Sequence, residues 1–94
     1  MALTHAVMFT LTDPADAAEA VQRLRDLGGR IPSLLELQAG TSIDGSAPHV
    51  LLVTRHADAQ GLADYQEHPV HQDLLGWIRP RIAQRRVVDT EDLG

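Results

Sequence analysis

The chain has 94 residues, no cysteine and a formal net charge of −5, with 44% hydrophobic and 22% charged residues. These values are typical of one small globular domain, and they exclude disulfides and thiolate chemistry. An acidic chain lacks the clustered basic residues that bind a phosphate backbone, so we expect no nucleic acid partner. No stretch approaches the ~20 apolar residues of a membrane span. Because no secretory signal is recognisable either, we expect a cytoplasmic protein without a membrane partner.

The first half of the chain predicts a strand, a helix and a hairpin. Alternating β-formers predict a strand over 3–11. The stretch at 12–29, "TDPADAAEAVQRLRDLGG", has an N-capping aspartate, an early proline and a closing Gly-Gly, which predict a helix. Strands over 34–43 and 49–56 flank a short segment dense in turn residues. We therefore expect these two strands to form a hairpin.

The second half predicts two helices and a last strand. A helix over 57–68 ends before a proline, because the residue that precedes a proline avoids the α region. The proline can itself begin a second helix over 69–78. "RRVVD" (85–89) predicts a short fourth strand, and the acidic end (90–94) a frayed tail. The order β-α-β-β-α-(α)-β is typical of a ferredoxin-like α+β fold, here as a single domain over 1–94.

The first and third predicted strands are apolar on both faces. In the first strand, Val7 and Phe9 lie on one face and Ala6 and Met8 on the other. Strands of this kind are usually covered on both sides, yet the predicted helices can cover only one face of a four-stranded sheet. Because soluble monomers rarely expose a large apolar patch, we expect a homodimer in which two sheets pack face to face.

The two histidines around Pro69 raise the question of a metal site. His68 and His71 are three residues apart, which could place both on one helix. Pro69 separates them, because His68 then lies outside the helix that contains His71. No cysteine is present, and no histidine spacing matches a known zinc motif. We therefore expect neither a metal ion nor another cofactor.

Acid–base chemistry is a second interpretation of the same segment. Tyr65 lies six residues before His71, and the corner at the proline could turn both side chains into one space. By strand parity, His5 and His49 each share a face with apolar residues. If these faces look inward, they form a pocket for a small apolar ligand. The candidate pocket residues are His5, Val7, Phe9, His49 and Leu51.

Each of these polar residues also has a structural interpretation. His68 can cap the helix that follows it, and His49 can simply begin a strand. His56, at the end of a strand beside an arginine, is expected at the surface. The four arginines between residues 79 and 86 are expected to be solvated or to contact a second copy of the chain, since cations are favourable at a helix end.

Four segments in order resemble the stress-responsive dimeric A/B barrel (Dabb) family. The most specific piece is the pattern Y-x-x-H-P-x-H at 65–71, and the resemblance extends from about residue 3 to residue 89. The segments are "THAVMF", "IPSLLELQAG", "HVLLVTRH" and "YQEHPVHQDLLGWIRPRIAQRRVVD".

The resemblance implies a fold and leaves two functions open. It implies a ferredoxin-like protomer that pairs into a two-fold dimer with an eight-stranded β-barrel between the protomers. Some members of the family have no established catalysis, which here implies a dimer that binds a small apolar ligand. A plant polyketide cyclase of the family instead implies a cofactor-free enzyme acting on a β-keto compound. In that case Tyr65 and His71 would be the acid–base pair, with His5 and His49 lining the pocket.

Overall fold

The computed structural model describes residues 2–91, which form one antiparallel sheet in the order β2-β3-β1-β4 with helices on one side. The strands are β1 (Leu3–Leu11), β2 (Glu36–Thr41), β3 (Val50–His56) and β4 (Ile82–Glu91). The helices are α1 (Ala17–Arg25), α2 (Ala59–Glu67) and α3 (Pro69–Ile78), with 3₁₀ turns η1 (Pro14–Asp16) and η2 (Arg79–Arg81). The predicted ferredoxin-like α+β fold and the hairpin of β2 and β3 are confirmed.

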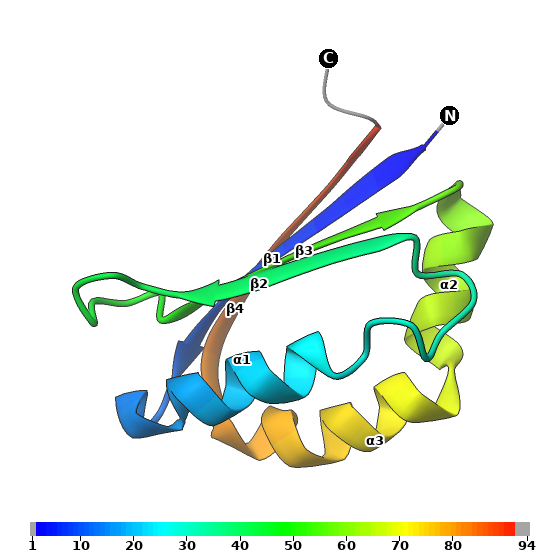
Figure 1. Ribbon diagram of the computed structural model, residues 1–94. Helices are drawn as coiled ribbons and strands as arrows, with labels where there is room; N and C mark the ends of the chain where they lie inside the picture. Colours follow the sequence, from blue (N-terminus) through cyan, green and yellow to red (C-terminus); the bar gives the residue numbers. More distant parts are fainter. Residues whose placement is uncertain (1, 92–94) are drawn as a thin grey trace.

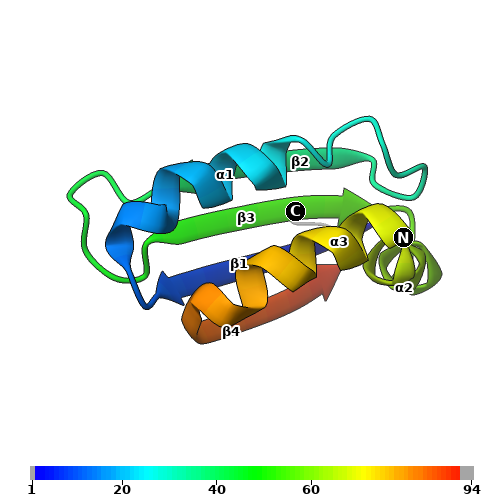
Figure 2. The same cartoon turned by 90° about the horizontal axis from the view of Figure 1, so that it is seen from below.

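All three helices lie on the same face of the sheet, with α1 and α3 running roughly along the strands and α2 at one end (Figures 1 and 2). The antiparallel register pairs Val7 of β1 with Leu52 of β3, so both side chains point toward the helices. They pack in one core with Leu24 of α1 and Ile78 of α3. The core therefore lies between the helices and one face of the sheet, and no element of residues 2–91 covers the opposite face.

The first helix begins as the sequence predicts, but in two steps. The Asp13 carboxylate accepts a hydrogen bond from the Ala15 N–H at 2.9 Å, and this starts the turn η1 before α1 begins at Ala17. The helix buries an apolar stripe that includes Val21 and Leu24. The chain leaves the helical region at Gly29, whose φ of +77° is readily adopted only by glycine.

The corner between α2 and α3 is set by a capping histidine and a proline. His68 has an extended backbone, and Pro69 occupies the first position of α3, where no N–H is needed. The His68 ring accepts a hydrogen bond from the Val70 N–H at 3.1 Å through Nδ1, so its capping role is realised. This corner places Tyr65, in the last turn of α2, beside His71, in the first turn of α3.

The last strand is longer than the sequence indicates. β4 pairs with β1 along nearly its whole length, and Thr90 and Glu91 lie opposite Thr4 and Leu3. The prediction of a frayed tail over 90–94 is therefore wrong for these two residues, because ladder pairing with a central strand holds their backbone in place. The remainder of that tail, residues 92–94, lies outside the described residues.

Candidate functional site

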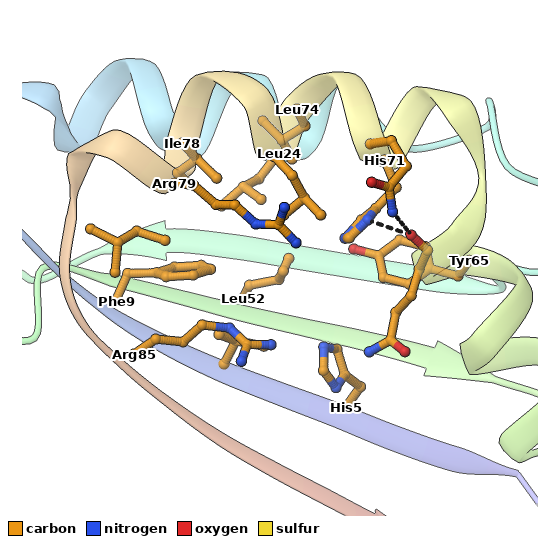
Figure 3. Close-up of a pocket in the computed structure, with 15 residues that line it drawn as sticks. His5, Phe9, Leu24, Leu52, Tyr65, His71, Leu74, Ile78, Arg79 and Arg85 are labelled. Carbon is orange, nitrogen blue, oxygen red and sulfur yellow. Dashed lines mark hydrogen bonds between the residues drawn. The ribbon is translucent and has the colours of Figure 1, made fainter.

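A pocket of about 360 Å³ lies between the helices and the covered face of the sheet. This volume is within the range of sites for small molecules. Its floor comes from β1, β3 and β4, and its walls from α1, α2, α3 and the chain after α3 (Figure 3). The lining residues are His5, Val7, Phe9, Leu24, Leu52, Tyr65, Gln66, His71, Gln72, Leu74, Leu75, Ile78, Arg79, Ile82 and Arg85.

Tyr65 is the most buried polar residue of the pocket. Its ring lies 4.5 Å from that of His71, 4.9 Å from that of His56 and 6.4 Å from that of His5, measured between ring centroids. Its hydroxyl has no hydrogen-bond partner within residues 2–91. Burial raises the pKa of Tyr65 to about 12, so the phenol keeps its proton at neutral pH. The pocket thus contains a hydroxyl donor whose acceptor is missing from the described part of the chain.

A hydrogen bond from one ring nitrogen fixes the orientation of the His71 ring. Its Nδ1 lies 3.0 Å from the carbonyl oxygen of Gln66. Because a carbonyl can only accept, Nδ1 carries the proton and donates it. Burial is the largest cause that lowers the pKa of His71 below its usual 6.5, so the ring is neutral at pH 7. In a neutral ring with Nδ1 protonated, Nε2 has a free lone pair and can act as a base.

His5 is oriented by a carboxylate on the neighbouring strand. The register of β1 and β4 places Asp89 opposite His5, and the Asp89 carboxylate accepts a hydrogen bond from His5 Nδ1. His5 is buried and lines the pocket. The carboxylate fixes the ring plane, so the other edge of the imidazole faces the same space as Tyr65 and His71.

His56 is buried, and the expectation that it lies at the surface is wrong. Its Nδ1 donates to the carbonyl oxygen of Ser33 at 2.8 Å, and its Nε2 accepts from the Thr54 hydroxyl at 2.9 Å. Its ring packs against Tyr65. The expectation rested on the position of His56 at the end of a strand beside an arginine. This position is covered in the structure, because β3 ends under α2. His56 therefore supports the Tyr65 ring from outside the pocket.

Two of the candidate pocket residues lie elsewhere. His49 directly precedes β3. Its ring Nδ1 accepts a hydrogen bond from the Leu11 backbone N–H at 3.0 Å, and its backbone N–H donates one to the Phe9 carbonyl oxygen at 2.8 Å. It therefore holds the end of β1 and does not line the pocket. Leu51 points to the uncovered face of the sheet, and its neighbour Leu52 takes the place in the pocket.

The structure brings five of the sequence candidates together and adds charged residues to them. His5, Val7, Phe9, Tyr65 and His71 line the same pocket.

Arg79 and Arg85 are exposed, as the sequence suggests for solvated arginines, and they also line the pocket. Arg85 lies opposite Phe9 in the register of β1 and β4 and therefore shares its face. Only this long-range pairing reveals the position, since β4 shows little alternation of its own.

The described residues contain neither a candidate metal site nor a candidate membrane-spanning helix. Within 2–91, no group of three or more histidine, aspartate or glutamate side chains is arranged to hold a metal ion. None of the helices in this part of the chain has the length and apolar character needed to cross a membrane.

The fold and pocket define a ferredoxin-like α+β protein with a ligand-sized cavity between its sheet and its helices. The model of the stress responsive A/B barrel domain (Dabb) family matches residues 3–92, nearly the whole chain. The chain therefore belongs to the Dabb family, as its motifs indicate. Among proteins with curated descriptions, none matches the sequence.

Solved structures of similar proteins share the whole fold. A dimeric ferredoxin-like protein of unknown function from Thermobifida fusca YX is 26% identical, with a TM-score of 0.85 over 98% of this chain and 92% of that one. A second dimeric ferredoxin-like protein of unknown function, from Jannaschia sp. CCS1, is 25% identical, with a TM-score of 0.78 over 98% and 100%. A candidate antibiotic biosynthesis monooxygenase from Chloroflexus aurantiacus J-10-fl is 15% identical, with a TM-score of 0.85 over 100% and 95%, and shares the fold alone.

Proposed function

We propose that this protein catalyses a cofactor-independent proton transfer on a small β-keto compound, with His71 as the base and Tyr65 as the hydrogen-bond donor. The observation that carries the proposal is the Tyr65 hydroxyl. It is buried, has no partner within residues 2–91, and lies beside His71 in one pocket. A polar group of this kind is expensive to bury without a partner, and a substrate carbonyl oxygen would supply the missing acceptor.

The chemistry follows from the protonation states of the two side chains. Nε2 of His71 removes a proton from the carbon between two carbonyl groups, and the electron pair of that C–H bond forms an enolate. Tyr65 donates a hydrogen bond to the enolate oxygen, where negative charge develops. In a substrate with a third carbonyl group farther along its chain, the enolate carbon then attacks that carbonyl carbon, which forms a C–C bond and an alkoxide. His71 returns its proton to the alkoxide, so the aldol product contains the same atoms as the substrate.

A second candidate function is ligand binding without turnover. Most of the lining residues are apolar, including Phe9, Leu24 and Ile78, and they suit the hydrocarbon part of a small molecule. In this case Tyr65 and His71 would only orient the ligand. Both candidates use the same pocket, so a measurement of proton transfer separates them.

We further propose that the protein is a homodimer whose sheets pack against each other to form the eight-stranded barrel. The uncovered face of the sheet carries a cluster of exposed apolar side chains on adjacent strands: Met8, Leu51 and Val88. The similar proteins from Thermobifida fusca YX and Jannaschia sp. CCS1 are described as dimeric. A second copy covers this face while leaving the pocket on the helix side of each sheet untouched.

Deuterium exchange tests the proton transfer without knowledge of the natural substrate. A small β-keto ester in D₂O is followed by proton NMR, which reports the loss of hydrogen from the carbon between the carbonyl groups. The protein should accelerate this exchange over buffer alone. His71→Asn should reduce the acceleration by about 100-fold or more, because it removes the base, and Tyr65→Phe should reduce it because the enolate loses its donor.

The matched control is His68→Asn. It removes a histidine three residues away that does not line the pocket, and asparagine is itself a good helix cap. This variant should exchange at the rate of the unmodified protein. Exchange that is no faster than in buffer, or equal in the His71 and His68 variants, contradicts the catalytic role of His71. Binding of the ester without exchange would instead support the second candidate.

A further inference from the structure

Among the arginines of the described residues, Arg79 and Arg85 are the two that line the pocket, and neither is paired with a carboxylate. Within residues 2–91, ion pairs to carboxylates engage Arg23, Arg55 and Arg81, but neither Arg79 nor Arg85. Figure 3 shows the side chains of Arg79 and Arg85 entering the pocket from opposite sides, the first from the chain just after α3 and the second from β4 in the floor. Both guanidinium groups extend toward the part of the pocket that contains the histidines and Tyr65.

The charge of the pocket is opposite to that of the chain. The chain has a formal net charge of −5, yet no aspartate or glutamate of the described part of the chain lines the pocket. The carboxylate of Asp89, on the same side of the sheet, is already engaged by His5. Burial lowers the pKa of His71 most, and the positive charges of Arg79 and Arg85 lower it further, so both charges act on the site. Both arginines are exposed where they line the pocket, and positive charge that is not paired with a carboxylate attracts an anion.

We propose that Arg79 and Arg85 bind a carboxylate of the ligand, so that the ligand class is a small β-keto acid. The keto part of this assignment rests on the proposed function of Tyr65 and His71. Guanidinium groups match the planar geometry of a carboxylate and form charge-assisted hydrogen bonds with it. The carboxylate then lies between Arg79 and Arg85, the ketone oxygen at Tyr65, and the alkyl chain on the apolar wall near Phe9.

A pair of probes that differ only in charge tests the carboxylate site. Freshly prepared 3-oxooctanoate and its methyl ester are titrated into the full chain, and binding is followed by NMR chemical shifts. The acid should bind roughly tenfold or more tightly than the ester, since an ester cannot accept charge-assisted bonds. Arg79→Gln and Arg85→Gln should each weaken binding of the acid by about tenfold, and neither should change binding of the ester.

The control variant is Arg30→Gln, which removes an exposed arginine that does not line this pocket. It loses the same formal charge and should leave the preference for the acid intact. Equal affinity for acid and ester, no binding of the acid, or an equal loss in Arg30→Gln overturns the proposal. Inorganic phosphate as a competitor separates the possible anions: if it displaces the acid at equal concentration, the carboxylate assignment is wrong.

The binding measurement is independent of catalysis. If the acid binds through Arg79 and Arg85 but its deuterium exchange is no faster than in buffer, the carboxylate site stands and the proton-transfer function fails. The opposite outcome is also recognisable. If deuterium exchange is equally fast for the ester and the acid, and if Arg79→Gln and Arg85→Gln change neither the exchange rates nor the affinity for the acid, the carboxylate site fails. The proton-transfer function then stands.

Discussion

At the scale of single residues, neither packing nor hydrogen bonding within the fold explains the hydroxyl group of Tyr65. Its ring packs against three histidine rings and is fully buried. A phenylalanine would keep this packing and would not bury an unpartnered oxygen. A buried donor without a partner destabilises a protein by about 1–3 kcal/mol. Retaining such a group is understandable when the missing partner is a ligand.

Tyr65→Phe should therefore separate stability from function. We expect the free energy of unfolding to stay the same or to rise by about 1 kcal/mol, because the variant removes an unsatisfied polar atom. Deuterium exchange on the β-keto ester should fall in the same variant. Urea denaturation followed by circular dichroism measures the stability.

Tyr65→Ala provides the comparison for packing. It deletes the ring as well as the hydroxyl and should lower the free energy of unfolding by about 3 kcal/mol or more, as large aromatic truncations in cores do. A comparable loss in Tyr65→Phe would mean that the hydroxyl has a structural partner, and the argument for a ligand acceptor would then fail.

At the scale of elements, buried histidines join segments that are far apart in the sequence. His56, at the end of β3, bonds to Ser33 in the segment before β2 and packs on Tyr65 of α2. His71 ties the start of α3 to the end of α2 through the Gln66 carbonyl. Burial lowers the pKa of both histidines, so the folded protein favours their neutral forms.

These histidines predict a loss of stability in mild acid. In the unfolded chain a histidine takes up its proton near pH 6.5, whereas the folded protein resists protonation until a lower pH. The unfolded state therefore binds more protons in this range, and the stabilising contribution is present above about pH 6.5 and is lost as the pH falls through the folded-state pKa. Urea midpoints measured from about pH 7.5 to about pH 5 should decrease.

His56→Gln tests the assignment of this effect. The variant should have a shallower decrease of the urea midpoint with falling pH than the unmodified protein, whatever its absolute stability. His68→Asn, which changes a histidine that only caps α3, should keep the original slope. Equal slopes in all three proteins would show that other groups govern the acid sensitivity.

At the scale of the whole molecule, the two faces of the sheet have different surroundings. One face holds the pocket and the core under the helices. The other exposes Met8 (41%), Leu51 (48%) and Val88 (60%) on three adjacent strands. Such a contiguous apolar surface is typical of an interface between protein chains. A homodimer would place its interface and its two pockets on opposite sides of each sheet.

Leu51→Asp should convert the proposed dimer into a monomer, because it would bury a charge without a partner between the two sheets. Size-exclusion chromatography with light scattering at micromolar concentration measures the molar mass. Ala18→Asp, on the exposed side of α1, adds the same charge on the helix side and should remain dimeric. A monomeric unmodified protein would contradict the proposed dimer.

Local chemistry predicted the elements and part of the site. The capping aspartate before η1 and the proline at the start of α3 mark helix starts from a few neighbouring residues, and the structure follows them. Because Pro69 makes a corner between two helices, the sequence also suggested that Tyr65 and His71 face one space. Strand parity placed His5 with Val7 and Phe9, and all three line the pocket.

Long-range pairing decided what the sequence left open. β3 is apolar on both faces, so alternation alone does not tell whether Leu51 or Leu52 meets the helices; the register with β1 selects Leu52. The pairing of β4 with β1 brings Arg85 into the pocket, and the packing of α2 buries His56. By itself the sequence determined the order of the elements and the corner at Pro69, because short-range backbone preferences specify them. Only the tertiary structure decided which side chains share the pocket, because this depends on contacts between distant segments.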